Sequence, residues 1–178
     1  IVAATPKRVF YSLPRGGATN VLYLHPRLAS AAAVARAVDE LVGRTELERA
    51  VSVYRDAVGR SIRIVDVRIS RDGTPLVRVE GGGYLPYSAL GDGLRASLYY
   101  TLMLSFLKKG AVFIDNPEMY MHPGLVDVLS HVIATSPHQY FIVTQSLDLV
   151  AEILELARDE VVVIRMCDCE VVDVLSGS

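Results

Sequence analysis

The sequence predicts an α/β fold in which a mainly parallel sheet is flanked by helices. Strand-like and helix-like segments alternate from residue 111 onward, a rhythm that is typical of parallel sheets. The run AVFID (111–115) is apolar without interruption, as expected of a strand that is covered on both faces. Residues 1–83 contain helix-like and hairpin-like segments, which predict a helical and β-hairpin elaboration of that sheet.

Extended segments and two helices are expected first along the chain. A helix begins near Ser30 and stops at Gly43, because glycine commonly ends a helix. Thr45 and Glu48 have the spacing of a capping box, which marks the start of a second helix. The elements predicted in this part are strands at 8–13 and 20–26 and helices at 30–43 and 45–59.

A hairpin and a long helix are predicted next. The turn Arg71-Asp72-Gly73 separates two strand-like segments, and the alternation slips at Ile64–Val65, which indicates a bulge. Beyond Leu98 the long helix is apolar on nearly every face and is therefore expected to be buried. The predicted elements are strands at 61–70 and 74–80, a helix from about 92 to 107, strand 111–115, helix 123–135, strand 139–144, helix 146–157, and strands 160–166 and 170–175.

The composition suits one globular domain or a large part of one. Of the 178 residues 51% are hydrophobic and 21% are charged, and the net charge of −2 creates no global basic field for DNA or an anionic membrane. No apolar run is long enough to cross a bilayer and no signal-peptide pattern is present, so a cytoplasmic location is expected. The first residue is Ile1 rather than methionine, which suggests that an upstream segment is missing. Scarce side-chain amides fit a thermophilic source.

The segment AVFIDNPEMYMHP (111–123) carries the strongest chemical signal. Asp115 ends a buried strand, at the edge where α/β sheets gather their ligands. A carboxylate there can hold Mg²⁺, directly or through water, beside nucleotide phosphates, and Glu118 could polarise a water molecule. The alternative is that Asp115 only caps the turn that precedes Pro117.

The segment YSALGDGLRAS (87–97) contains a glycine-flanked helix start. Gly91 and Gly93 bracket Asp92, and exposed backbone N–H groups at a helix N-terminus bind anions. Ser88 could add a hydroxyl donor. Alternatively, these small residues only cap the helix.

A third segment, QYFIVTQSLDLV (139–150), reads as a strand, a polar turn and a helix. The turn Thr144-Gln145-Ser146 could reach a γ-phosphate, or Ser146 could simply be the N-cap of the following helix. Taken together, the three segments favour the ligand-binding interpretation over the capping one, because their order along the chain is distinctive.

In that order they resemble the second half of an ABC-type ATPase domain, and in particular the AAA-type ATPases allied to the OLD (overcoming-lysogeny-defect) family. SALGDGLR (88–95) is similar to the signature of these proteins, DNPEMYMHP (115–123) to their Walker B segment, and TQS (144–146) to their switch. The resemblance covers residues 84–157. It implies a subdomain at 84–178 that carries these motifs and a variable region at 1–83.

The resemblance implies a site for ATP and Mg²⁺ that is shared between two nucleotide domains. Ser88, Gly91 and Gly93, in the same segment as Asp92 and Arg95, would contact the γ-phosphate of a nucleotide held by a partner. Asp115 would be the magnesium ligand of the Walker B strand, directly or through water. The implied partner is a second copy of the chain or a protein that carries the other half of the cassette.

Three departures from the family pattern affect this expectation. No G-x-x-x-x-G-K-[ST] motif occurs, so the phosphate-binding P-loop is expected upstream of Ile1 or on a partner. Asn116 occupies the position of the usual catalytic glutamate, and Gln145 that of the switch histidine. An amide can orient water but cannot accept its proton, so hydrolysis should be slow unless Glu118 compensates.

Three functions therefore stay open at this point. The first is an ATPase half-domain whose cycle drives a linked activity, which could act on nucleic acid through a linked domain. The second is a non-catalytic module that uses nucleotide-gated dimerisation or interaction, and the third is an unrelated α/β domain with an accidental Walker B-like strand. No acidic cluster of the Toprim nuclease type is recognisable, so the sequence predicts no nuclease activity.

Overall fold

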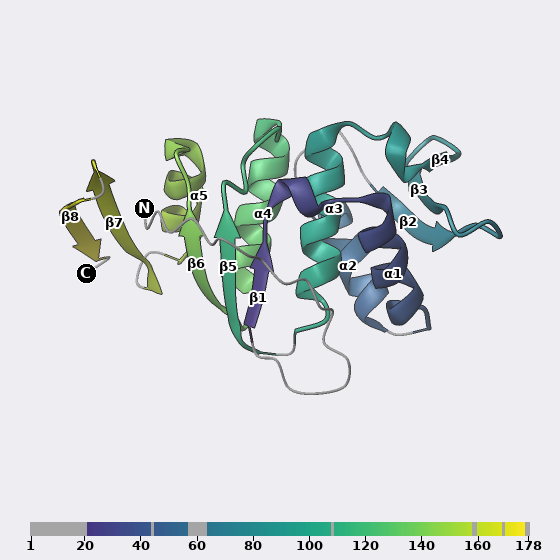
Figure 1. Cartoon of the computed structure of the whole chain (residues 1–178), viewed down its shortest axis with the longest axis horizontal. Coiled ribbons are helices and arrows are strands. Elements are labelled where there is room, and N and C mark those ends of the chain that lie inside the picture. Colours follow the sequence, from purple (N-terminus) through teal and green to yellow (C-terminus); the bar gives the residue numbers. More distant parts are fainter. Residues whose placement is uncertain are drawn as a thin grey trace.

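A computed structural model describes residues 21–43, 45–56, 64–107, 109–157, 160–168 and 170–176 (Figure 1). The strand expected at 8–13 lies outside these residues. No helix in the described ranges is long and apolar enough to cross a membrane.

Three parallel strands form the central sheet, in the order β1-β5-β6, which confirms the predicted α/β class. They are β1 (Val21–Leu24), β5 (Ala111–Asp115) and β6 (Gln139–Val143). β5 lies in the middle and pairs with β1 and β6 on its two sides. Because β1 comes from the N-terminal region, residues far apart in sequence complete one sheet.

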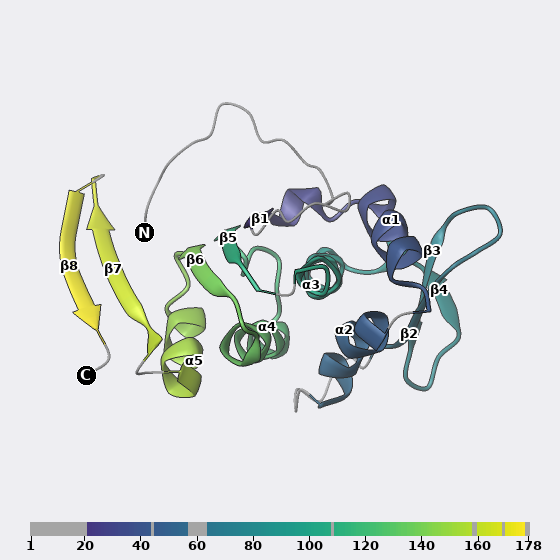
Figure 2. The same cartoon turned by 90° about the horizontal axis from the view of Figure 1, so that it is seen from below.

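Helices cover one face of this sheet and continue beyond it (Figure 2). They are α1 (Ala31–Leu41), α2 (Thr45–Asp56), α3 (Asp92–Leu104), α4 (Pro123–Thr135) and α5 (Leu147–Ala157), with short 3-10 turns η1 (Pro26–Leu28) and η2 (Tyr87–Ala89). α3 is buried on nearly all sides, as its apolar composition predicts, and it contacts α1, α2 and α4. The buried hydroxyl of Tyr54 in α2 lies 2.8 Å from the hydroxyl of Ser97 in α3.

The N-terminal helices also pack against a small antiparallel sheet of β2 (Ile64–Ile69), β3 (Pro75–Val79) and β4 (Tyr84–Pro86). The predicted hairpin is confirmed, with its turn at Asp72 and Gly73, and the register shifts between Ile64 and Asp66 where a bulge was expected. Gly73 has a φ of +83°, a left-handed conformation that favours glycine.

Among the described residues, the last two strands do not join the central sheet. β7 (Val162–Cys167) and β8 (Glu170–Ser176) pair antiparallel with each other, and β6 pairs with β5 alone in the part of the chain that the structure describes. Valine and isoleucine side chains of this hairpin are exposed, including Val162, Ile164 and Val174. An isolated two-stranded hairpin with exposed apolar residues is only marginally stable, so its edges are expected to be covered in the working protein.

The expectation that the strand at 111–115 is covered on both faces is wrong for the described residues. Val112 and Ile114 are buried under the helices, whereas Phe113 is 40% exposed on the opposite face. There it stacks on Phe141 of β6, with ring centroids 4.7 Å apart, and Tyr23 of β1 is in register with it. An apolar run shows that a strand can be covered on both faces, but it does not supply the covering element.

Partial burial lowers the pKa of His138, which precedes β6, below its ordinary value of 6.5. Since the folded state disfavours the protonated ring, the stability that the neutral ring contributes is present above pH 6.5 and is lost as the pH falls through the folded-state pKa. We expect urea midpoints to fall between pH 7.5 and pH 5, and to fall less in His138→Gln.

Candidate functional site

The predicted site forms where the three parallel strands end, at the upper edge of the sheet in Figure 1. β1 ends next to His25, β5 ends at Asp115, and β6 is followed by Thr144. The start of α3, which contains the last four residues of the predicted signature (92–95), lies at the same edge. Carboxyl ends of parallel strands gather ligands in many α/β proteins.

The Asp115 carboxylate is oriented by hydrogen bonds from two side chains. Asn116 donates from Nδ2 to Oδ1 over 2.8 Å, and the hydroxyl of Tyr23 is 3.5 Å from Oδ2. The side chain is half-buried, so the carboxylate keeps access to a ligand at the sheet edge. These contacts hold Asp115 in one orientation without enclosing it.

Asn116 adopts a left-handed conformation with a φ of +45°. Its backbone N–H donates to the carbonyl of Val143 over 2.8 Å, which continues the pairing of β5 with β6 by one residue. Asparagine tolerates this conformation better than glutamate does. The local backbone therefore offers a structural reason for asparagine at this position, besides any chemical one.

Glu118 connects the loop after β5 with the turn after β6. Its Oε1 accepts a hydrogen bond from the backbone N–H of Gln145 over 3.1 Å. The other carboxylate oxygen, Oε2, is buried and has no hydrogen-bond partner among the described residues. The structure thus brings together four residues that the sequence selected: Asp115, Asn116, Glu118 and Gln145.

The turn after β6 shows the capping arrangement that was the simpler interpretation of its sequence. Ser146 Oγ accepts from the backbone N–H of Leu149 over 3.2 Å, and Thr144 Oγ1 accepts from that of Ser146 over 3.0 Å. Ser146 therefore caps α5, whereas the Gln145 side chain is exposed and free to meet a ligand.

The predicted signature segment begins α3. Gly91 is the N-cap residue and makes no side-chain capping bond, so the first N–H groups of α3 keep their capacity to bind an anion. Asp92 forms an ion pair with Arg95 within this turn, and the exposed Ser88 lies in η2 just before it. The hydroxyl of Tyr87 donates to the carbonyls of Arg95 and Ala29, both at 2.9 Å, which anchors the segment.

Gly93 joins the signature segment to the loop after β5. A Cβ atom at this position would lie 2.3 Å from the carbonyl oxygen of Tyr120 and 3.1 Å from the Cα of Met121. Only glycine allows this approach of two backbones. At Gly91, by contrast, a Cβ would meet no atom within 4 Å.

Tyr23 and His25 also belong to this edge, although the sequence interpretation passed over them. Partial burial lowers the pKa of His25, while the nearby Asp115 carboxylate acts in the opposite direction. His25 Nδ1 accepts from the backbone N–H of Arg27 over 3.1 Å, which fixes the ring. The signal in the sequence was the strand-like segment at 20–26, which contains Tyr23 and His25. No local pattern, however, shows that this strand pairs with β5.

The donor set at Asp115 fits a hydrated Mg²⁺ better than an enclosed metal. Among the described residues no group of three or more His, Cys, Asp or Glu side chains is arranged to hold a metal ion. Magnesium commonly uses one or two carboxylates and completes its shell with water and substrate phosphates. A single accessible carboxylate is therefore compatible with Mg²⁺ that is bound together with a nucleotide.

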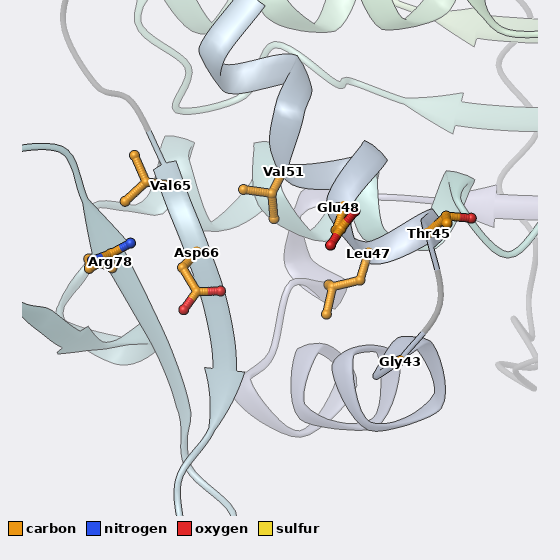
Figure 3. A pocket seen from close by; sticks show the side chains of 8 residues that line it. All are labelled: Gly43, Thr45, Leu47, Glu48, Val51, Val65, Asp66 and Arg78. Carbon is orange, nitrogen blue, oxygen red and sulfur yellow. The ribbon is translucent and has the colours of Figure 1, made fainter.

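A separate cavity of about 700 Å³ lies between α2 and the small sheet (Figure 3). Its charged lining residues are Glu48, Asp66 and Arg78, and the lining includes no residue of the site at the sheet edge. This cavity therefore contributes nothing to the chemistry at Asp115.

Solved structures with a similar fold include structures of SMC proteins. The SMC head domain from Thermotoga maritima has a TM-score of 0.56 and 12% identity, over 86% of this chain and 52% of that chain. A structure from a study of ATP-driven dimerization and DNA-stimulated activation of SMC ATPases has a TM-score of 0.51 and 14% identity, over 75% of this chain and 83% of that chain. At these identities the similarity establishes the fold alone.

Sequence comparison gives a curated relative and a family. The uncharacterized protein MJECL11 of Methanocaldococcus jannaschii is 33% identical over 75 aligned residues, and the match covers 40% of this chain and 66% of MJECL11. The family model described as "AAA domain, putative AbiEii toxin, Type IV TA system" matches residues 8–151, which include all three site segments and most of the region before them. This chain therefore belongs to that family of AAA domains.

Proposed function

We propose that this chain supplies the Walker B, switch and signature elements of an ATP-binding and ATP-hydrolysing site. The observation that carries the proposal is the convergence of Asp115, Gln145 and the uncapped start of α3 at one edge of a parallel sheet. Phosphoryl transfer requires mainly positioning and neutralisation of charge, and these groups are suited to both. Membership of an AAA-domain family supports a nucleotide as the ligand.

In such an arrangement the signature groups and Asp115 of one chain would serve two different nucleotide sites of the dimer. Asp115 would hold hydrated Mg²⁺, which neutralises phosphate charge when it is bound. The N–H groups after Gly91, with Ser88 and Arg95 nearby, would contact the γ-phosphate of a nucleotide that a partner holds. A second copy of this chain or a protein with the complementary half would be that partner.

The open parts of the sheet support a P-loop on another segment or chain. A P-loop unit is a strand, a glycine-rich loop and a helix. β6 has a free outer edge among the described residues, and Phe113 and Phe141 form an uncovered apolar face beside it. A strand at that edge and a helix on that face would bring the connecting loop next to Asp115.

The second candidate is a nucleotide-gated module that binds ATP and dimerises but hydrolyses it poorly. Asn116 favours this candidate, because its side chain donates to Asp115 and cannot accept a proton from water. Phosphate release measured under multiple-turnover and single-turnover conditions distinguishes the two candidate functions. A nucleotide-gated module would bind ATP and dimerise without releasing phosphate.

Finer features of the proposal rest on motifs alone. The relation to the OLD branch depends on the segments at 88–95, 115–123 and 144–146. The proposal also includes a cytoplasmic location and a thermophilic source. It further includes an action on nucleic acid through a linked domain.

The test is an Mg-ATP titration by calorimetry of the natural protein that carries this chain, as parent and as Asp115→Ala. Loss of the carboxylate should weaken Mg²⁺-dependent binding at least about tenfold, since hydrogen bonds and ion contacts to charged groups contribute about 1.5–3 kcal/mol each. Asp127→Ala, on the exposed surface of α4, should bind like the parent. Equal affinity of the parent and Asp115→Ala would refute the assignment, and tight Asp115-dependent binding by residues 1–178 alone would refute the need for an external P-loop.

A further inference from the structure

The loop at 116–121 contacts two of the predicted nucleotide-binding segments at once. On one side Glu118 Oε1 accepts from the backbone N–H of Gln145 over 3.1 Å. On the other side the carbonyl of Tyr120 lies directly against Gly93, close enough that a Cβ there would be 2.3 Å from the oxygen. The loop is therefore a physical connection between the turn after β6 and the start of α3.

Local bonds make this connection stiff. The backbone N–H of Met119 donates to the carbonyl of Asn116 over 3.1 Å, and that of Met121 donates to the carbonyl of Glu118 over 2.9 Å. Asn116 and Tyr120 both have positive φ values, of +45° and +68°. Non-glycine residues keep such conformations only where the surrounding structure fixes them, so we expect the loop to move as one unit.

The environment of Glu118 suits an anchor better than a proton acceptor. One carboxylate oxygen is used by the Gln145 N–H, and the other is buried without a partner among the described residues. The fully buried hydroxyl of Tyr100 in α3 also lacks a hydrogen-bond partner there. Burial is the main reason that the pKa of Tyr100 is raised, and Tyr99 and Glu118 raise it further.

We propose that Glu118 is a positioning residue that ties the 144–146 turn to the signature helix α3, so that ligand contact at Gln145 changes the position of Gly93. This inference rests on the proposed function, because it explains how the two segments of the same chain respond together. It assigns Glu118 no proton transfer. The atom that matters is the oxygen that accepts from Gln145, and an amide oxygen can accept the same hydrogen bond, although more weakly than a carboxylate oxygen.

The pair Glu118→Gln and Glu118→Ala separates positioning from acid–base chemistry. Glutamine keeps an acceptor for the Gln145 N–H but cannot take a proton from water, whereas alanine loses both properties. A positioning role predicts that turnover of the complete protein falls at least about tenfold in Glu118→Ala, from loss of a charge-assisted hydrogen bond. Glu118→Gln should restore turnover to within about threefold of the parent, since a neutral hydrogen bond keeps most of that positioning.

Amide hydrogen exchange, resolved by residue, tests the connection without reference to activity. In Glu118→Ala the amide of Gln145 should exchange about tenfold faster because it loses its acceptor. The amide of Arg95, which bonds to the carbonyl of Gly91 in the first turn of α3, should also exchange faster. Glu118→Gln and the exposed-surface control Glu155→Ala should match the parent at both amides, and Ile114 should stay protected in every variant.

Three outcomes would overturn the inference. Faster exchange at Gln145 with no change at Arg95 would show that the loop does not connect the two segments. A Glu118→Gln variant that keeps the protection of Gln145 yet loses turnover as Glu118→Ala does would show that the carboxylate acts chemically. Parent-like turnover in both variants would show no role for Glu118. If the complete protein lacks Asp115-dependent ATP turnover, the proposed function fails, while the exchange data still decide the connection.

Discussion

Replacing Gly93 by alanine is expected to lower the free energy of unfolding by about 2–3 kcal/mol, a typical cost of forcing atoms into a packed site. The added Cβ would lie 2.3 Å from the carbonyl oxygen of Tyr120, and both contacting parts are backbone. Neither can move aside by changing a side-chain rotamer, so α3 or the loop at 116–121 must shift. Alanine's better helix propensity offsets only about 1 kcal/mol of this cost.

Gly91→Ala is the matched control, because it makes the same change two residues earlier. A Cβ at Gly91 has no neighbour within 4 Å, and its φ of −61° suits any residue. We expect a loss within about 1 kcal/mol, from the weaker N-cap. Urea unfolding with an unchanged denaturant dependence measures both values. Equal losses in the two variants would mean that Gly93 is not in close contact with Tyr120.

Replacing Asn116 by glutamate should raise ATP turnover of the complete protein by about 100-fold, the lower end of what general-base catalysis contributes. The change places a proton acceptor directly after Asp115, at the position where the resembled ATPases carry one. It also removes the hydrogen bond from Asn116 Nδ2 to Asp115 and puts a second carboxylate beside the Asp115 carboxylate. We expect a stability loss of about 1 kcal/mol from the left-handed backbone at this residue.

Asn116→Gln isolates the carboxylate, since glutamine has the size of glutamate and pays the same conformational cost. Single-turnover phosphate release should stay at the parent rate in Asn116→Gln and rise only in Asn116→Glu. If both variants release phosphate at the same rate, position 116 does not limit hydrolysis. The nucleotide-gated module would then gain support over the ATPase, provided that Mg-ATP still binds.

Much of the fold was predictable because its signals are local. The apolar run that ends at Asp115, the glycine-bounded start of α3 and the turn at 71–73 each specify an element within a few neighbouring residues. The candidate residues Asp115, Glu118 and Gln145 were selected because polar groups follow buried strands, and Asn116 was selected through the resemblance to the Walker B segment of ABC-type ATPases. Parallel pairing of β5 with β6 then places the two strand ends side by side.

Other features depend on contacts between distant parts of the chain. Tyr23 reaches Asp115 across 92 residues of sequence, and no local pattern specifies that β1 pairs with β5. The closeness of Gly93 to Tyr120 likewise arises from the packing of α3 against the loop that precedes α4. Strand periodicity tells which side chains share a face, but not which element covers that face. Phe113 is an example, because it lies in an apolar strand and is nevertheless exposed beside Phe141.

The sequence by itself determined the α/β class, the order of the elements and the residue types at the sheet edge, because propensity and hydrophobic periodicity act over short distances. Only the tertiary structure decided that Tyr23 and His25 join Asp115, that Glu118 bonds to Gln145, and that Phe113 and Phe141 are exposed on one sheet face. These are pairings between segments that lie far apart in the chain, and their free energy comes from packing and hydrogen bonds that exist only after the chain has folded.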